Sequence, residues 1–143
     1  MRAVPVSSGS AGYSGTPLPR KLGIKPEARV ALIDAPPGFE GVLGPLPDGV
    51  RLFARLARRL DVIVFFVDER GSLERRFDAL ATALVPNGGL WIAWPKKASG
   101  VATDLTENVV REVGLAHGLV DNKVCAITDV WSGLRLVRRL ADR

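Results

Sequence analysis

The sequence is poor in the residue types that build disulfide frameworks, zinc sites and membrane spans. Cys125 is the single cysteine among 143 residues, so no disulfide can form within the chain, and a cytoplasmic, reducing location is expected. His117 is the single histidine, and these two side chains fall short of the four ligands of a structural zinc site. The longest apolar run, residues 62–67, is far too short to cross a bilayer. Residues 1–20 contain no apolar run that could be the core of an export signal.

A phosphate-binding loop is also missing. No Gly-x-x-x-x-Gly-Lys pattern occurs, which disfavours nucleotide hydrolysis. After a first strand over residues 29–34, a nucleotide-binding fold would place a glycine-rich turn whose backbone amides hold an anion. This chain instead has Ala-Pro-Pro-Gly-Phe over residues 35–39, between the carboxylates of Asp34 and Glu40. We interpret this turn as too stiff and too acidic to wrap a dinucleotide or the tail of a methyl donor.

The composition is that of an ordinary globular domain, with 47% hydrophobic and 24% charged residues. We expect a disordered tail over residues 1–13 and one domain over residues 14–143. The net charge of +5 is concentrated at two ends, because residues 1–28 and 135–143 each carry four basic residues and one acidic residue. Basic ends can bind nucleic acid through its phosphates or can be solvated termini, and the sequence leaves both possibilities open.

The hydrophobic pattern predicts an α/β fold. The run over residues 61–67 is typical of a central strand buried on both faces, and it is followed by a helix capped by Ser72 and by a turn at residues 86–89. Such a βαβ unit closes right-handed onto a parallel sheet. Asp104 opens the next helix, whose predicted buried stripe includes Val109 and Ala116. We expect strands over residues 29–34, 50–55, 61–67, 90–94, 123–128 and 134–138, the last one antiparallel.

The predicted fold is therefore a mostly parallel sheet with helices on both faces and a C-terminal antiparallel hairpin. Counting along the chain, the expected strand order is second, first, third, fourth, sixth, fifth. Trp91 and Trp94 differ by an odd number within one strand, so they point to opposite faces of the sheet.

Seven residues are candidates for ligand binding, because they follow strands at the edge where open α/β sheets bind ligands or lie in the last hairpin. Three of these features have a structural alternative: Asp34 could cap its own turn, the loop at residues 96–99 could be an exposed basic turn, and Trp131 could be a lid over the core. No catalytic or metal-ligating residue is assigned. Cys125 lies mid-strand among apolar residues, so a dyad with His117 is disfavoured. The seven are Asp34, Gly38, Glu40, Lys96, Lys97, Ser99 and Trp131.

A second basic feature is the run Arg51, Arg55, Arg58 and Arg59. These side chains could contact nucleic acid or an acidic partner, or they could form a solvated face.

The sequence resembles a family of short uncharacterised bacterial proteins, catalogued as a domain of unknown function. The likeness covers about residues 14–138, and its most specific segment is Trp-Pro-Lys-Lys-Ala-Ser-Gly at residues 94–100. This resemblance implies fold and compartment but no reaction.

A remoter likeness is to Rossmann-like methyltransferases. Residues 84–90 look like the helix-turn-strand in the second half of that fold, and the final antiparallel strand agrees with it. The departure is at the first strand, where Asp34 and Pro36 replace glycines of the family's triplet and only Gly38 is kept. No acidic residue that would hold a ribose closes the second strand. Both differences count against adenosylmethionine, so no cofactor is predicted.

Three functions are compatible with these features. The first is a non-catalytic binding or regulatory module that lacks the glycine-rich cofactor loop and takes a small anionic ligand or a protein partner. The alternative is a minimal adenosylmethionine-dependent methyltransferase with a degenerate cofactor site. The second alternative is a nucleic-acid-associated protein that binds through its basic ends. A membrane partner is not expected.

Overall fold

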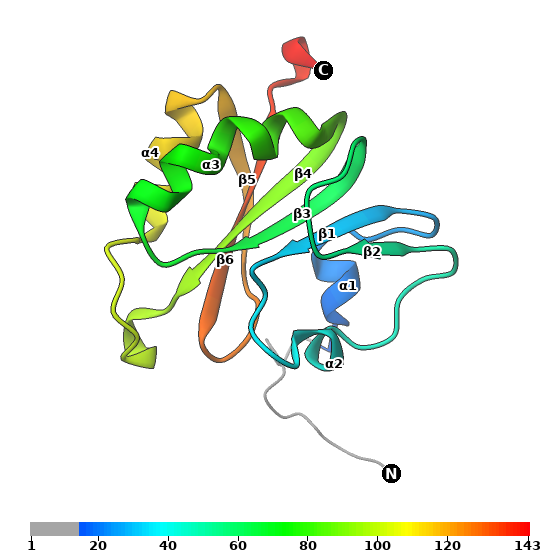
Figure 1. Ribbon diagram of the computed structural model, residues 1–143, viewed down its shortest axis with the longest axis horizontal. Coiled ribbons are helices and arrows are strands. Elements are labelled where there is room, and N and C mark those ends of the chain that lie inside the picture. Colours follow the sequence, from blue (N-terminus) through cyan, green and yellow to red (C-terminus); the bar gives the residue numbers. More distant parts are fainter. Residues whose placement is uncertain (1–14) are drawn as a thin grey trace.

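The computed structural model describes residues 15–143, so the tail predicted over residues 1–13 lies outside the described part. Six strands form one sheet in the order β2-β1-β3-β4-β6-β5, which confirms the predicted order (Figure 1). The first four strands pair in parallel, and β6 pairs antiparallel with β4 and β5. The strands are β1 (Arg29–Ile33), β2 (Arg51–Phe53), β3 (Leu60–Phe66), β4 (Leu84–Pro95), β5 (Leu119–Ala126) and β6 (Trp131–Arg138).

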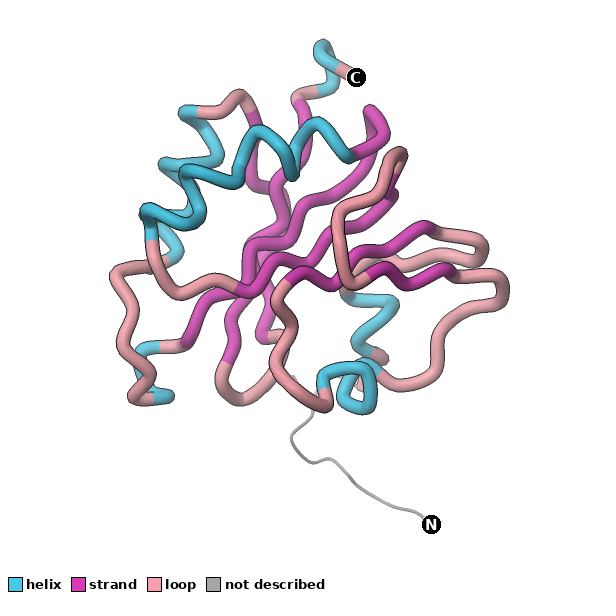
Figure 2. The backbone as a smooth tube through the Cα atoms, in the orientation of Figure 1, coloured by secondary structure: helices cyan, strands magenta, loops and turns pink. Residues whose placement is uncertain are grey.

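Helices cover both faces of the sheet, as predicted. On one face, α3 (Arg70–Ala83) and α4 (Glu107–Ala116) pack through a core cluster that includes Phe77 and Val110. On the other face, the short helices α1 (Leu18–Lys21) and α2 (Phe39–Leu43) pack through a second cluster. Figure 2 shows these two layers of helix with the strands between them. Two short 3-10 helices, η1 (Lys97–Ser99) and η2 (Leu140–Asp142), complete the described elements.

Strand β3 forms the centre of the molecule because its side chains alternate between the two core clusters. Val64 and Phe66 face α1 and α2, whereas Ile63 and Phe65 face α3 and α4, and all four are at most 3% exposed. A strand that is buried on both faces has a nearly continuous apolar sequence, and this explains the apolar run within residues 61–67. The two tryptophans of β4 also face opposite ways, as predicted: Trp91 belongs to one cluster and Trp94 to the other.

The predicted caps of α3 and α4 are wrong. Helix α3 begins at Arg70, and the backbone N–H of Arg70 donates to the carboxylate of Asp104 at 2.7 Å. Asp104 therefore caps α3 from a distant loop, while Thr106 caps α4 by accepting from the N–H of Val109. Helix α4 also starts later than predicted, and the face it turns to the core differs: its buried residues are Val110, Val113 and Gly114, whereas Val109 is only partly buried and Ala116 is exposed.

The predicted turn at residues 86–89 lies within β4, which starts directly after α3. The register between β3 and β4 shifts there, from Leu60 opposite Leu84 to Val62 opposite Gly89. A side chain at position 88 would bring its Cβ within 3.0 Å of the carbonyl oxygen of Leu60, so glycine permits the close approach. The guanidinium of Arg138 donates to the carbonyls of Ala81 and Val85, and thereby ties β6 to the end of α3.

The connection from β2 to β3 is unusually short. It crosses β1 in residues 54–59 and contains no helix. Parallel strands are usually joined by a crossover of a dozen or more residues that includes an α-helix. The guanidinium of Arg29 donates to the carbonyl of Arg58 at 3.0 Å and holds this short crossover against β1.

No helix among residues 15–143 is long and apolar enough to cross a membrane.

Candidate functional site

The turn after β1 encloses a pocket of about 560 Å³ at the carboxyl ends of β1 and β2. Two left-handed residues shape this turn: Asp34 has φ of +57°, and Gly38, which precedes α2, has φ of +81°. Aspartate adopts this region more readily than most residues, and glycine does so without strain. The lining consists of Leu32, residues 34–40, Leu52, Phe53 and Ala54.

Asp34 is held at the mouth of this pocket by α3. Its carboxylate lies 3.1 Å from the guanidinium of Arg76, and both side chains are largely exposed. The same guanidinium lies 5.0 Å from the ring centroid of Phe65, a cation–π contact. Asp34 therefore acts across two elements, in contrast to the local turn cap that was its structural alternative.

Glu40 is an exposed residue in the first turn of α2, directly beside the lining residues Gly38 and Phe39. Among residues 15–143 it forms no side-chain hydrogen bond or ion pair, so its carboxylate is open to a ligand. The phenyl ring of Phe39 is buried beneath it and meets Phe66 edge-on, with ring centroids 4.8 Å apart.

Trp131 continues this aromatic contact on the far side of Phe66. The two ring centroids are 5.1 Å apart and the rings are nearly perpendicular. Trp131 is half-buried and opens β6, whereas the sequence placed it in the turn before that strand. This packing is what a lid over the core would make, although part of the indole stays accessible.

Lys96, Lys97 and Ser99 lie in the loop after β4, at the same edge of the sheet. The Ser99 hydroxyl donates to the carbonyl of Lys96 at 2.6 Å and accepts from the N–H of Val101, so it serves the loop itself. The N–H of Lys96 donates to the carbonyl of Val130, which joins this loop to the last hairpin. Neither lysine forms an ion pair with another residue in the described range.

The predicted site residues therefore fall into two groups. Asp34, Gly38 and Glu40 line one pocket, while the loop after β4 and Trp131 lie outside that lining, on the other side of β3. The aromatic contacts of Phe66 connect the groups. Sequence reasoning missed Arg76 and Phe53. Phe53 could have been found from its position at the end of the second strand. No local sequence feature distinguishes Arg76 from the other charged residues of its helix.

His117 and Cys125 lie on different faces of the sheet and do not form a dyad. The His117 ring stacks on Phe77, and its Nδ1 lies 2.8 Å from the carboxylate of Asp78. Cys125 packs against the cluster on the opposite face, and burial raises the pKa of its thiol, although Lys21 and Lys123 lower it in part. No group of three or more potential metal ligands occurs in the described residues.

The basic C-terminal end is largely engaged within the fold. The guanidinium of Arg138 donates to the carbonyls of Ala81 and Val85 at the C-terminal end of α3. Arg143 donates to the carbonyl of Arg138, and the guanidinium of Arg135 packs against Gly89. Of the four basic side chains in residues 135–143, only Arg139 projects without such a contact.

Comparison with known proteins identifies the fold but no family. No family model matches the sequence, and no curated protein matches it, so the resemblance to the uncharacterised bacterial family receives no support. Solved structures of methyltransferases are similar. A SAM-dependent methyltransferase from Aquifex aeolicus superposes with a TM-score of 0.59 at 10% identity, covering 82% of this chain and 85% of that one.

Two further structures widen the comparison. Magnesium protoporphyrin IX methyltransferase from Synechocystis PCC 6803, solved with bound SAM, gives a TM-score of 0.55 at 11% identity, covering 85% of this chain and 74% of that chain. A possible exported protein from Bordetella parapertussis gives a TM-score of 0.61 at 13% identity, covering 85% of this chain and 64% of that chain. The fold is thus a methyltransferase-like Rossmann fold, and these identities establish nothing beyond the fold.

Proposed function

We propose that the pocket beside Asp34 and Glu40 binds adenosylmethionine and that methyl transfer is the activity of this protein. The observation that carries the proposal is the position of the pocket. It lies at the carboxyl ends of β1 and β2, where open α/β sheets bind ligands, on a fold shared with methyltransferases. Its volume of about 560 Å³ is within the range of small-molecule sites.

The chemistry of the lining suits this donor. Leu32, Leu52 and Phe53 offer apolar surface for an adenine ring. The carboxylates of Asp34 and Glu40 suit ribose hydroxyls and the positively charged sulfonium and ammonium groups. This proposal departs from the sequence-based interpretation that the acidic turn disfavours a methyl donor as well as a dinucleotide. The donor has no phosphate for the carboxylates to repel, and its sulfonium and ammonium groups are attracted by them.

The proposed role of the protein is positioning. The donor supplies a methyl group on a sulfonium, which an acceptor attacks directly, so no side chain has to act as a nucleophile. Asp34 and Glu40 would hold the donor, and the left-handed Gly38 would let the backbone approach it. Orientation of two reactants alone accounts for a large share of the rate enhancement in such transfers.

Titration calorimetry tests the proposal. We expect heat on titration with adenosylmethionine and with its demethylated product, and at least tenfold weaker binding for Glu40→Gln. Asp142→Asn, an exposed acidic residue in η2, is the matched control and should bind like the wild type. The absence of heat at millimolar ligand would refute the proposal, as would equal losses in both variants.

A second candidate, a non-catalytic binding module for a small anion, is favoured by one observation. Lys96 and Lys97 form no ion pair within residues 15–143 and follow the carboxyl end of β4, at the edge where such sheets bind ligands. A thermal-shift screen with phosphate and organic anions tests it, since a hundredfold excess over Kd stabilises by about 2.7 kcal/mol. Charge reversal at both lysines should abolish the shift without lowering the melting temperature, and an unchanged shift would refute this site.

A further inference from the structure

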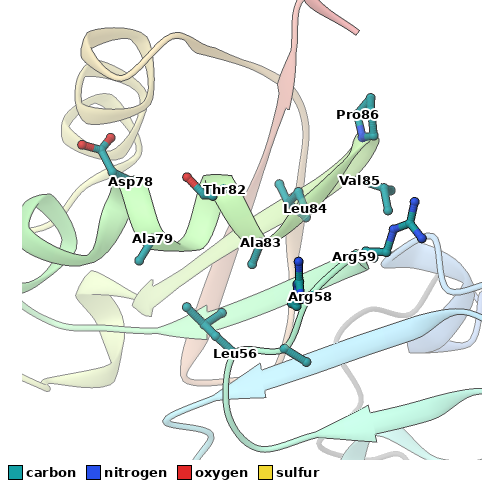
Figure 3. A pocket seen from close by; sticks show the side chains of 11 residues that line it. Leu56, Arg58, Arg59, Asp78, Ala79, Thr82, Ala83, Leu84, Val85 and Pro86 are labelled. Atoms are coloured by element: carbon teal, nitrogen blue, oxygen red, sulfur yellow. The ribbon is translucent and has the colours of Figure 1, made fainter.

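A second hollow of about 760 Å³ lies beside the short crossover between β2 and β3, and its lining shares no residue with that of the proposed donor pocket. One wall is formed by the crossover residues Leu56, Ala57, Arg58 and Arg59, and the other by the exposed side of α3. Figure 3 shows Asp78, Ala79 and Thr82 along α3, with Arg58 and Arg59 on the crossover side. The floor is formed by Leu84, Val85 and Pro86 at the start of β4. We refer to this hollow as the α3 groove.

The α3 groove lies where the fold would normally carry a helix. A crossover between parallel strands usually contains one, and here residues 54–59 contain none. Within the described part of the chain, helix α3 consequently has no neighbouring helix on this side. Apart from Asp78, the side chains it presents there are small: Ala79, Thr82 and Ala83. Small contact residues let a second helix approach closely, because the distance between packed helix axes depends on the side chains at the contact.

The charges around the groove are almost all positive. Arg55, Arg58 and Arg59 are exposed, and in the described part of the chain their guanidinium groups have no hydrogen bond or ion pair. The lining contains one acidic residue, Asp78, whose carboxylate oxygen lies 2.8 Å from Nδ1 of His117. The groove thus combines an apolar floor with a rim of unpaired arginines.

We propose that the α3 groove is a docking site for an acidic amphipathic helix of a partner protein. The apolar stripe of that helix would cover Leu56, Ala83 and Val85, and its carboxylates would meet the arginines of the rim. This is the helix-in-groove mode of peptide recognition, with charge complementarity setting orientation and association rate.

Two other occupants fit less well. A single-stranded nucleic acid would use aromatic side chains to stack its bases, and the groove lining contains none. The chain's own first fourteen residues contain Arg2 and no acidic residue, so they do not complement an arginine rim.

The probe is a synthetic helical peptide with a leucine stripe flanked by glutamates, measured by fluorescence anisotropy on the full chain. A matched peptide with lysines in place of the glutamates is the ligand control. Two protein variants distinguish the contribution of charge from that of shape. The double variant Arg58→Glu and Arg59→Glu reverses the charge of the rim, and Ala79→Trp fills the groove. Arg20→Glu, on α1 at the opposite face, is the protein control.

We expect the acidic peptide to bind at least tenfold more tightly than the basic one, with at least a tenfold loss in both groove variants and less than twofold in Arg20→Glu. Amide shifts on peptide addition should be confined to residues 56–59 and 78–86. Melting curves identify any variant that is unfolded, and the peptide comparison on the wild type still tests the proposal.

Three outcomes would overturn the proposal. Equal binding of the two peptides would mean that the groove has no charge preference. Stronger binding of single-stranded RNA or DNA, lost in the same variants, would assign the surface to nucleic acid. A concentration-dependent dimer that the same variants abolish would assign it to a second copy of this chain.

Discussion

The carboxylate of Asp34 lies 3.1 Å from the guanidinium of Arg76, which is 42 residues away in the chain. The pair fastens the turn after β1 to the middle of α3, and so connects the mouth of the proposed donor pocket to the helix layer. Because both side chains are largely exposed, the pair contributes at most about 1 kcal/mol to stability. Its main effect is to orient the Asp34 carboxylate.

Replacement of Asp34 separates its charge from its backbone conformation. Asn tolerates the left-handed region as well as Asp does, so Asp34→Asn should change the free energy of unfolding by less than about 1 kcal/mol. Ala tolerates the left-handed region less well. Asp34→Ala should therefore lower the free energy of unfolding by about 1–2 kcal/mol more than Asp34→Asn does, through backbone strain. Denaturant unfolding of both variants measures the difference. Equal stability of the two would show that the positive φ at this position costs nothing.

Asp104 should matter for α3, although it lies in another segment of the chain. Its carboxylate accepts the N–H of Arg70 at 2.7 Å, so Asp104→Ala should lower the free energy of unfolding by about 1 kcal/mol, as for other lost caps. Ser72→Ala is the matched comparison and should stay within about 0.5 kcal/mol, because Ser72 lies inside the helix. The opposite ranking in urea unfolding would contradict this assignment.

Arg135 carries a buried donor that has no partner among the described residues. Its side chain lies against Gly89, its Nε is buried without a hydrogen-bond partner in the described residues, and burial together with Arg143 lowers the pKa of its guanidinium. A buried unpaired donor costs about 1–3 kcal/mol, so Arg135→Met should raise the free energy of unfolding by about 1 kcal/mol. Arg139→Met, at an exposed position, should have almost no effect. A less stable Arg135→Met protein would indicate an ion pair or a ligand contact for this side chain.

The thiol of Cys125 should react slowly in the folded protein. Burial is the main cause of its raised pKa, so the folded state favours the neutral thiol. An acid whose pKa is higher in the folded state destabilises the fold as pH rises. The unfolded thiol ionises first, near its ordinary value of about 8.5, and stability falls above that pH. Alkylation by iodoacetamide at pH 8 should be at least tenfold slower than in denaturant, and Cys125→Ala should flatten the alkaline loss of stability. Equal alkylation rates would refute the burial.

The strands and their order could be predicted because their signals are local. Residues 61–67 carry the apolar run of a central strand, and the βαβ rule then orders the sheet around it. The caps could not be predicted, since Asp104 and Arg70 are 34 residues apart and only the tertiary fold brings them together. The start of β4 was missed for the same reason, because residues 86–89 have turn composition and pair only through the register shift opposite β3.

The candidate site was predictable in part. The turn around Asp34 and Glu40 follows directly from its position after the first strand. That Lys96 and Trp131 lie outside the pocket depends on β3 separating the two groups, which residue spacing alone does not reveal. The α3 groove was visible in the sequence only as a run of arginines, and its apolar floor comes from the start of β4.

The placement of β6 between β4 and β5 has a consequence for how the chain assembles. In the described sheet β5 pairs only with β6, so during synthesis it emerges before its partner. Strand β4 likewise keeps an open edge until Trp131–Arg138 has followed. A chain cut before residue 131 would leave both β4 and β5 without their β6 partner. Such a fragment is expected to aggregate, in contrast to a chain that loses only residues 139–143.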